Sequence, residues 1–69
     1  MNIKYYFFET TGWTAEEKVF HSCVINRTDR DTAQRIAKEL KAAAQKRGLK
    51  HIRVAIYSVR EYDYCGTIR

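Results

Sequence analysis

The chain has 69 residues, which is enough for one small hydrophobic core and too few for a second domain. Its composition, 45% hydrophobic and 30% charged residues, is that of a globular protein and excludes a disordered tail. The net charge of +5 makes nucleic acid, an anionic surface or an acidic protein a reasonable partner, although charge spread along a chain also simply maintains solubility.

The first two predicted elements are strands that form a hairpin. Residues 3–10 are rich in aromatic side chains, residues 19–26 are largely apolar, and both segments alternate between two faces. Gly12 permits the chain to turn in the longer connection between them.

Residues 28–47 are predicted to form the one helix of the chain. Thr28 is positioned to cap its first turn, and Gly48 to end it in a left-handed conformation. The apolar residues follow the three-four spacing of a single stripe, which is narrow and rich in alanine, so the helix is expected to lie close against a sheet. The stripe consists of Ala33, Ile36, Ala37, Leu40, Ala43 and Ala44.

Residues 52–60 are predicted as the third strand, and an alternation that runs on through Tyr62 and Tyr64 suggests that it outreaches its neighbours. The resulting ββαβ order favours an α+β fold, in which a three-stranded, mainly antiparallel sheet of order 2-1-3 carries the helix on one face. The alternative, in which the third strand lies parallel to the second, stays open.

All three strands are apolar on both faces, whereas one helix covers only one face. The aliphatic side of the third strand is expected to meet the helix. The helix-facing set is then Ile3, Tyr5, Phe7, Val19, Cys23, Ile25, Ile52, Val54 and Ile56. The helix-free set is Tyr6, Phe8, Phe20, Val24, Tyr57 and Val59, with Lys4, His51 and Arg53 among them. Apolar surface left over in this way usually meets a partner.

The first functional hypothesis is therefore a non-enzymatic interaction module. It forms a homodimer or binds another protein through the helix-free face or through the edge of the third strand. The predicted partner-binding residues are Tyr6, Phe8, Trp13, Phe20, Tyr57 and Val59. Alternatively, the loop that carries Trp13 and the tail at residues 62–68 fold over this face and complete the core.

The second hypothesis is a basic protein that binds single-stranded nucleic acid. Bases would stack on the aromatic side chains, while nearby cations hold the phosphates. The predicted cations are Lys4, Lys38, Lys41 and Arg53. The signature of the RNA-recognition motif does not occur in any strand, which weakens this hypothesis.

The sequence gives little support for a metal, a cofactor or catalysis, and none is predicted. His21 and Cys23 share a strand face, and His51 and Cys65 could join them, but the close ligand pairs of zinc motifs are missing. Cys23 is expected to be a small buried hydrophobe. Ser22 points away from its neighbour His21, which excludes a catalytic triad there, and no small-molecule substrate is expected. An enzyme that is completed only in an oligomer is the weakest option.

The chain contains no apolar run of the roughly 18–20 residues that cross a membrane, and its first residues do not resemble a signal peptide. No membrane partner and a cytoplasmic location are therefore expected. Size, basic charge and the lack of motifs are compatible with a small accessory protein of a bacterium or a phage.

Overall fold

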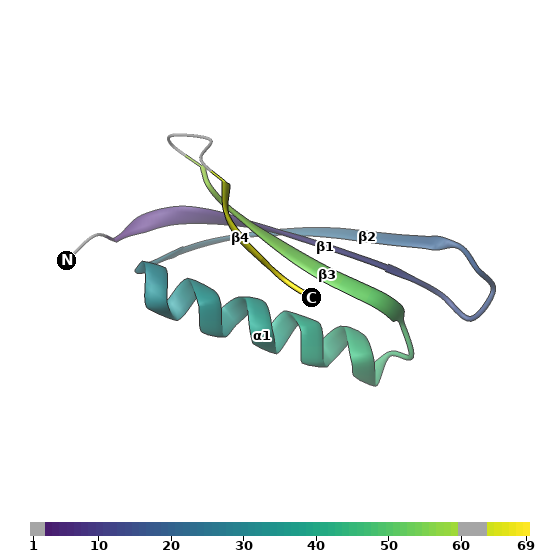
Figure 1. Cartoon of the computed structure of the whole chain (residues 1–69). Helices are drawn as coiled ribbons and strands as arrows, with labels where there is room; N and C mark the ends of the chain where they lie inside the picture. The colour runs from purple at the N-terminus through teal and green to yellow at the C-terminus, as the bar shows by residue number, and fades with distance from the viewer. Residues whose placement is uncertain (1–2, 60–63) are drawn as a thin grey trace.

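The computed structural model describes residues 3–59 and 64–69. It has one helix packed on an antiparallel sheet (Figure 1), which confirms the α+β class. The sheet has four strands rather than the three that were predicted. The elements in chain order are β1 (Lys4–Trp13), β2 (Val19–Thr28), α1 (Arg30–Lys46), β3 (Lys50–Ser58) and β4 (Tyr64–Ile68).

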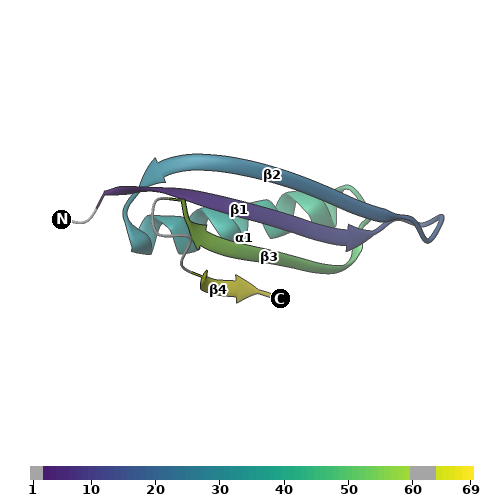
Figure 2. The ribbon, with the colours of Figure 1, turned by 90° about the horizontal axis from the view of Figure 1, so that it is seen from above.

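The strand order is β2-β1-β3-β4, with every neighbouring pair antiparallel (Figure 2). The favoured order of the first three strands is thus confirmed. The prediction that β3 forms an edge of the sheet is wrong, because β4 pairs with it from Val54 to Tyr57. β3 ends at Ser58, and Tyr64 belongs to the returning strand β4. The predicted continuation of β3 through Tyr62 lies outside the described residues.

The N-cap of the helix lies one residue after the predicted cap, Thr28. Thr28 is the last residue of β2, and Asp29 is the N-cap, whose carboxylate accepts a hydrogen bond from the backbone N–H of Thr32 at 2.7 Å. This hydrogen bond is the main cause that lowers the pKa of Asp29 from its ordinary value of 3.8. At the other end, Gly48 has φ +84°, which confirms the predicted left-handed stop.

Replacing Asp29 with alanine is expected to lower the denaturation midpoint at neutral pH, because a helix N–H loses its acceptor. The carboxyl pKa is lower in the folded than in the unfolded chain, so the charge stabilises the fold above pH 3.8. That contribution is lost as the pH falls through the folded pKa. The stability gap between wild type and Asp29→Ala in urea titrations should therefore narrow below about pH 4. Asp29→Asn, which keeps a capping oxygen, is the control, and a gap independent of pH would contradict the assignment.

The hydrophobic core lies between α1 and one face of the sheet. Three alanines, at positions 33, 37 and 44, are buried where the helix meets the strands, so its backbone approaches the sheet closely. The remaining apolar core residues come from the two central strands, and they are Tyr6, Phe8, Ile52, Val54 and Ile56. The predicted alanine-rich contact and the aliphatic face of β3 are therefore confirmed, except that Ala43 of the predicted stripe is exposed.

The faces of β1 and β2 are the reverse of those predicted. Tyr6 and Phe8 face the helix and are 3% and 0% exposed, whereas Tyr5 on the opposite side is 53% exposed. Strand register explains the difference. Phe8 lies opposite Ile56 on β3, and residues that lie opposite one another share a face of the sheet. Alternation alone could not decide, because a shift of one residue exchanges the two faces and both are apolar here.

Residues 64–68 of the tail do not fold over the helix-free face in the way that the alternative supposed, because they lie in the sheet as β4. Residues 62 and 63 of that tail lie outside the described residues. Within the part of the chain that the structure describes, no helix combines the length and the apolar character needed to cross a membrane.

Candidate binding face

An apolar row crosses the helix-free face from one edge of the sheet to the other. We call it the aromatic row, and its members, in the order of the strands, are Ile25, Phe7, Tyr57 and Tyr64. The rings of Phe7 and Tyr57 have centroids 6.0 Å apart, and those of Tyr57 and Tyr64 are 5.6 Å apart, both in tilted arrangements. Such geometry is favourable between aromatic rings, so the row is a preformed surface.

The aromatic row borders a shallow hollow of about 340 Å³. It is lined by Phe7 of β1, by Tyr57 of β3 and by Val59, which directly follows β3. Ile25 of β2 closes it on that side. Ile25 is 60% exposed and Tyr64 61% exposed, so both ends of the row are open to water. Two further large apolar residues, Ile3 and Tyr5, are exposed at the start of the chain.

Three of the predicted partner-binding residues do not lie on this face. Tyr6 and Phe8 are buried beneath α1. Phe20 lies on the same side as α1, with the guanidinium carbon of Arg47 4.9 Å from the centre of its ring. The prediction that these three form the helix-free surface is wrong for the register reason given above.

The other three predicted residues do lie on the helix-free side. Tyr57 belongs to the aromatic row, and Val59 lines the hollow beside it. Trp13 alternates with the buried Gly12 at the far end of β1, where it is partly exposed. Their part in binding remains a prediction.

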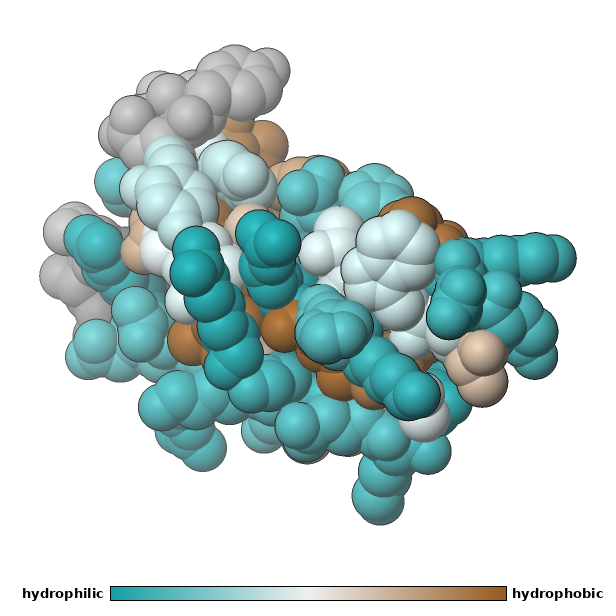
Figure 3. Space-filling view, turned by 45° about the vertical axis from the view of Figure 1, so that its right-hand side comes forward, coloured by the Kyte–Doolittle hydropathy of each residue, from teal (hydrophilic) through white to brown (hydrophobic). Residues whose placement is uncertain are grey.

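The four cations predicted for nucleic acid are only partly brought together. Lys41 and Arg53 line a hollow of about 460 Å³ beside α1 and β3, with His51 and Arg69. Lys41 also donates a hydrogen bond through Nζ to the backbone oxygen of Arg69. Lys4 lies at the opposite end of the sheet, where it pairs with Thr28. Lys38 is exposed on α1, whose part of the surface is mostly hydrophilic (Figure 3).

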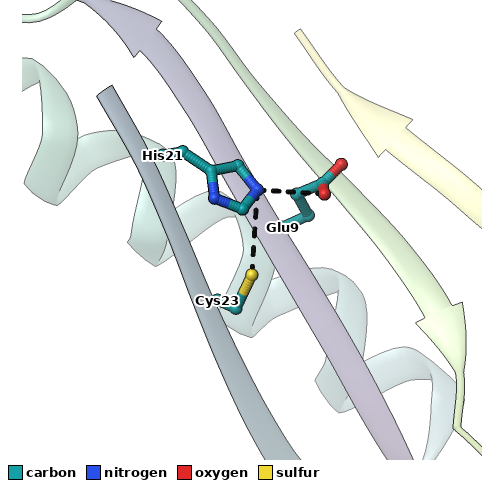
Figure 4. A group of neighbouring side chains, drawn as sticks. All are labelled: Glu9, His21 and Cys23. Atoms are coloured by element: carbon teal, nitrogen blue, oxygen red, sulfur yellow. Dashed lines mark hydrogen bonds and ion pairs between the residues drawn. The ribbon is translucent and has the colours of Figure 1, made fainter. Parts of the chain in front are cut away.

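A polar cluster that the sequence reasoning did not assemble lies on the helix-free face of the hairpin formed by β1 and the edge strand β2 (Figure 4). His21 Nε2 is 3.0 Å from Glu9 Oε2 and 3.8 Å from Cys23 Sγ. His21 and Cys23 are two positions apart on β2, and Glu9 is paired with Cys23 across the hairpin. The expectation that Cys23 is buried is wrong, because it is exposed on this face.

The signal for this cluster was present in the hairpin. Once Trp13 pairs with Val19 across the short connection, regular pairing brings Glu9 opposite Cys23. Glu9 therefore joins the cluster through register, and the spacing between His21 and Cys23 alone could not reveal it.

Comparisons of the chain with protein-family models, with curated proteins and with solved structures found no match.

Proposed function

We propose that this protein acts by binding rather than by catalysis, and that its partner is a second copy of the chain docked on the helix-free face. The observation that carries the proposal is the aromatic row, which places large apolar side chains on the sheet face opposite α1. Among the described residues, no helix or strand lies over this face. Contiguous exposed apolar surface of this kind commonly marks a protein interface.

The size of the face supports a dimer. The molecule measures 42 × 19 × 15 Å, so the projected outline of a face along its longest dimension is roughly 600–800 Å², which is an upper limit for flat contact. A standard protein interface buries about 800 Å² on each partner. A second copy would also enlarge a core that, at this chain length, supplies only about 3–5 kcal/mol.

The arrangement of the row also suits a symmetric pair. A two-fold axis parallel to the strands, between β1 and β3, would set Phe7 of one copy against Tyr57 of the other, and the converse. Sheets that pack face to face lie about 10 Å apart and interdigitate their side chains, which the open hollow beside the row permits.

Single-stranded nucleic acid remains the alternative proposal, with weaker support. The aromatic side chains and the cations that it requires lie apart. Tyr57 in the aromatic row is four residues, or about 13 Å, along β3 from Arg53 in the basic hollow. The carboxylate of Glu9 also lines the apolar hollow, where it would repel a phosphate.

Substituting Tyr57 with glutamate is expected to weaken self-association about 30-fold or more, because a buried aromatic contact at the centre of an interface is worth 2 kcal/mol or more. Sedimentation velocity over a range of protein concentrations measures the dissociation constant. Circular dichroism shows whether the variant keeps its helix.

The matched control is Ala42→Glu, which adds the same charge at an exposed position of α1. It is expected to leave the dissociation constant unchanged. A wild-type protein that stays monomeric at all concentrations would rule the homodimer out, and equal effects of both substitutions would move the interface away from the aromatic row.

A further inference from the structure

We propose that Glu9, His21 and Cys23 bind a transition-metal ion of the Zn²⁺ type. All three residues come from one copy of the chain, so the monomer alone can bind the ion, on the same face that the proposed dimer uses. Each offers one ligand atom, and the three atoms lie within 4.8 Å of one another.

The two distances from His21 Nε2 to the other ligand atoms are close to those of a tetrahedral zinc site. Zinc binds imidazole nitrogen and carboxylate oxygen at about 2.0–2.2 Å and thiolate sulfur at about 2.3 Å. The corresponding tetrahedral edges are about 3.3 Å for nitrogen to oxygen and about 3.6 Å for nitrogen to sulfur. The structure has 3.0 Å from His21 to Glu9 and 3.8 Å from His21 to Cys23. Side-chain adjustments of a few tenths of an ångström bring these two edges to the zinc geometry.

The backbone already holds the three side chains on one side of the sheet. Residues two positions apart on a strand point to the same face, as do residues that lie directly opposite across a pair of strands. His21 and Cys23 meet the first condition, and Glu9 and Cys23 meet the second. Because the hairpin register fixes all three, a metal ion can bind without a change of fold.

The same geometry argues against a catalytic relay of cysteine, histidine and carboxylate. In a relay the histidine contacts its two partners through different ring nitrogens. Here Glu9 Oε2 and Cys23 Sγ both approach Nε2 of His21 (Figure 4). The imidazole, the carboxylate and the thiol therefore converge on one point and do not form a chain. A single cation requires its ligands to converge in this way.

The ligand types select the class of metal. One sulfur, one nitrogen and one carboxylate oxygen form a set that zinc accepts, whereas Ca²⁺ and Mg²⁺ prefer oxygen ligands alone. The deprotonated thiol and the carboxylate together balance the two charges of the ion, and binding releases the thiol proton. Three protein ligands leave a fourth position open to water or to an incoming group. The side chains of His21 and Glu9 are 51% and 36% exposed, so in the monomer this position faces solvent.

Cobalt(II) is the probe for the test, since it occupies zinc sites and its absorption spectrum reports both tetrahedral geometry and sulfur ligation. Titration of the reduced, full-length protein should give one cobalt per chain, with a thiolate charge-transfer band that Zn²⁺ abolishes. Cys23→Ser should remove this band. His21→Ala and Glu9→Gln should weaken zinc binding by at least about tenfold, because even the loss of an outer-shell partner costs that much.

The chain supplies matched controls, because its other cysteine and its other histidine lie outside the cluster. Cys65→Ser and His51→Ala should keep both the spectrum and the zinc affinity. A band that survives in Cys23→Ser, or that disappears in Cys65→Ser, would overturn the site, as would cobalt bound without sulfur ligation, an adventitious ion only. The Tyr57→Glu variant should bind the metal normally, so a failed metal titration and a failed dimer are distinguishable.

Discussion

Alanine in place of Phe8 is expected to unfold most of the protein, whereas alanine in place of its neighbour Phe7 leaves the protein folded. Phe8 is 0% exposed beneath α1, and removal of a buried phenylalanine costs about 3–5 kcal/mol. That loss equals the whole net stability of about 3–5 kcal/mol that a core of this size provides. Circular dichroism and urea denaturation at low protein concentration measure the effect.

The two substitutions form their own control, since they remove the same side chain from adjacent positions on opposite faces of β1. Phe7 is only partly buried, in the aromatic row, so Phe7→Ala should reduce self-association more than it reduces the stability of the monomer. If Phe7→Ala unfolded the monomer and Phe8→Ala did not, the orientation of β1 would be the reverse of that described.

Leucine in place of Ala37 is the second substitution with a large expected effect, a loss of about 1–3 kcal/mol. Ala37 is 0% exposed where α1 lies on the sheet, so three added carbon atoms must displace the helix or distort its neighbours. The midpoint of urea denaturation should fall accordingly, while the far-ultraviolet spectrum in the absence of urea keeps its helical shape.

Ala42→Leu provides the comparison on the same helix, because Ala42 is exposed. Leucine and alanine are both good helix formers, so this variant should stay within about 0.5 kcal/mol of wild type. If both substitutions lowered the free energy of unfolding equally, leucine would destabilise the helix at any position, and the close contact with the sheet would not be the cause.

The helix and its environment are the part of the fold that the sequence predicts well. A three-four spacing over many residues has one interpretation, and an alanine stripe implies close packing. Gly48 marks the end of the helix because glycine adopts the left-handed conformation there without a steric penalty. The cap was misplaced by one position, since Thr28 and Asp29 both have an oxygen that can accept from the first turn.

The faces of the hairpin could not be predicted from alternation, because both faces of β1 carry aromatic residues. What decides between them is the register with β3, a long-range property in which Phe8 meets Ile56. Strand β4 was missed for a related reason. A run of alternating residues looks the same whether it continues a strand or returns beside it. The alternation therefore predicts Tyr64 and the residues after it as a continuation of β3 or as a tail, whereas they pair beside β3.

The same difference between local pattern and strand pairing decides which residues of the candidate site can be predicted from the sequence. Tyr57 was placed correctly because the aliphatic face of β3 fixed the direction of the opposite face. The cluster of Glu9, His21 and Cys23 needed the pairing of two strands, which the order of residues along one strand does not contain.

The central position of β1 has a consequence for how the chain folds during synthesis. Glu9 pairs with Cys23 within the hairpin, but its partner on the other side, Ala55, lies 46 positions further along the chain. The hairpin therefore leaves the ribosome well before α1 and β3, and Phe8 stays in contact with water until both have arrived. Closing that long loop is expected to set the folding rate, and a nascent chain that pauses before β3 presents an unsealed hydrophobic sheet to chaperones.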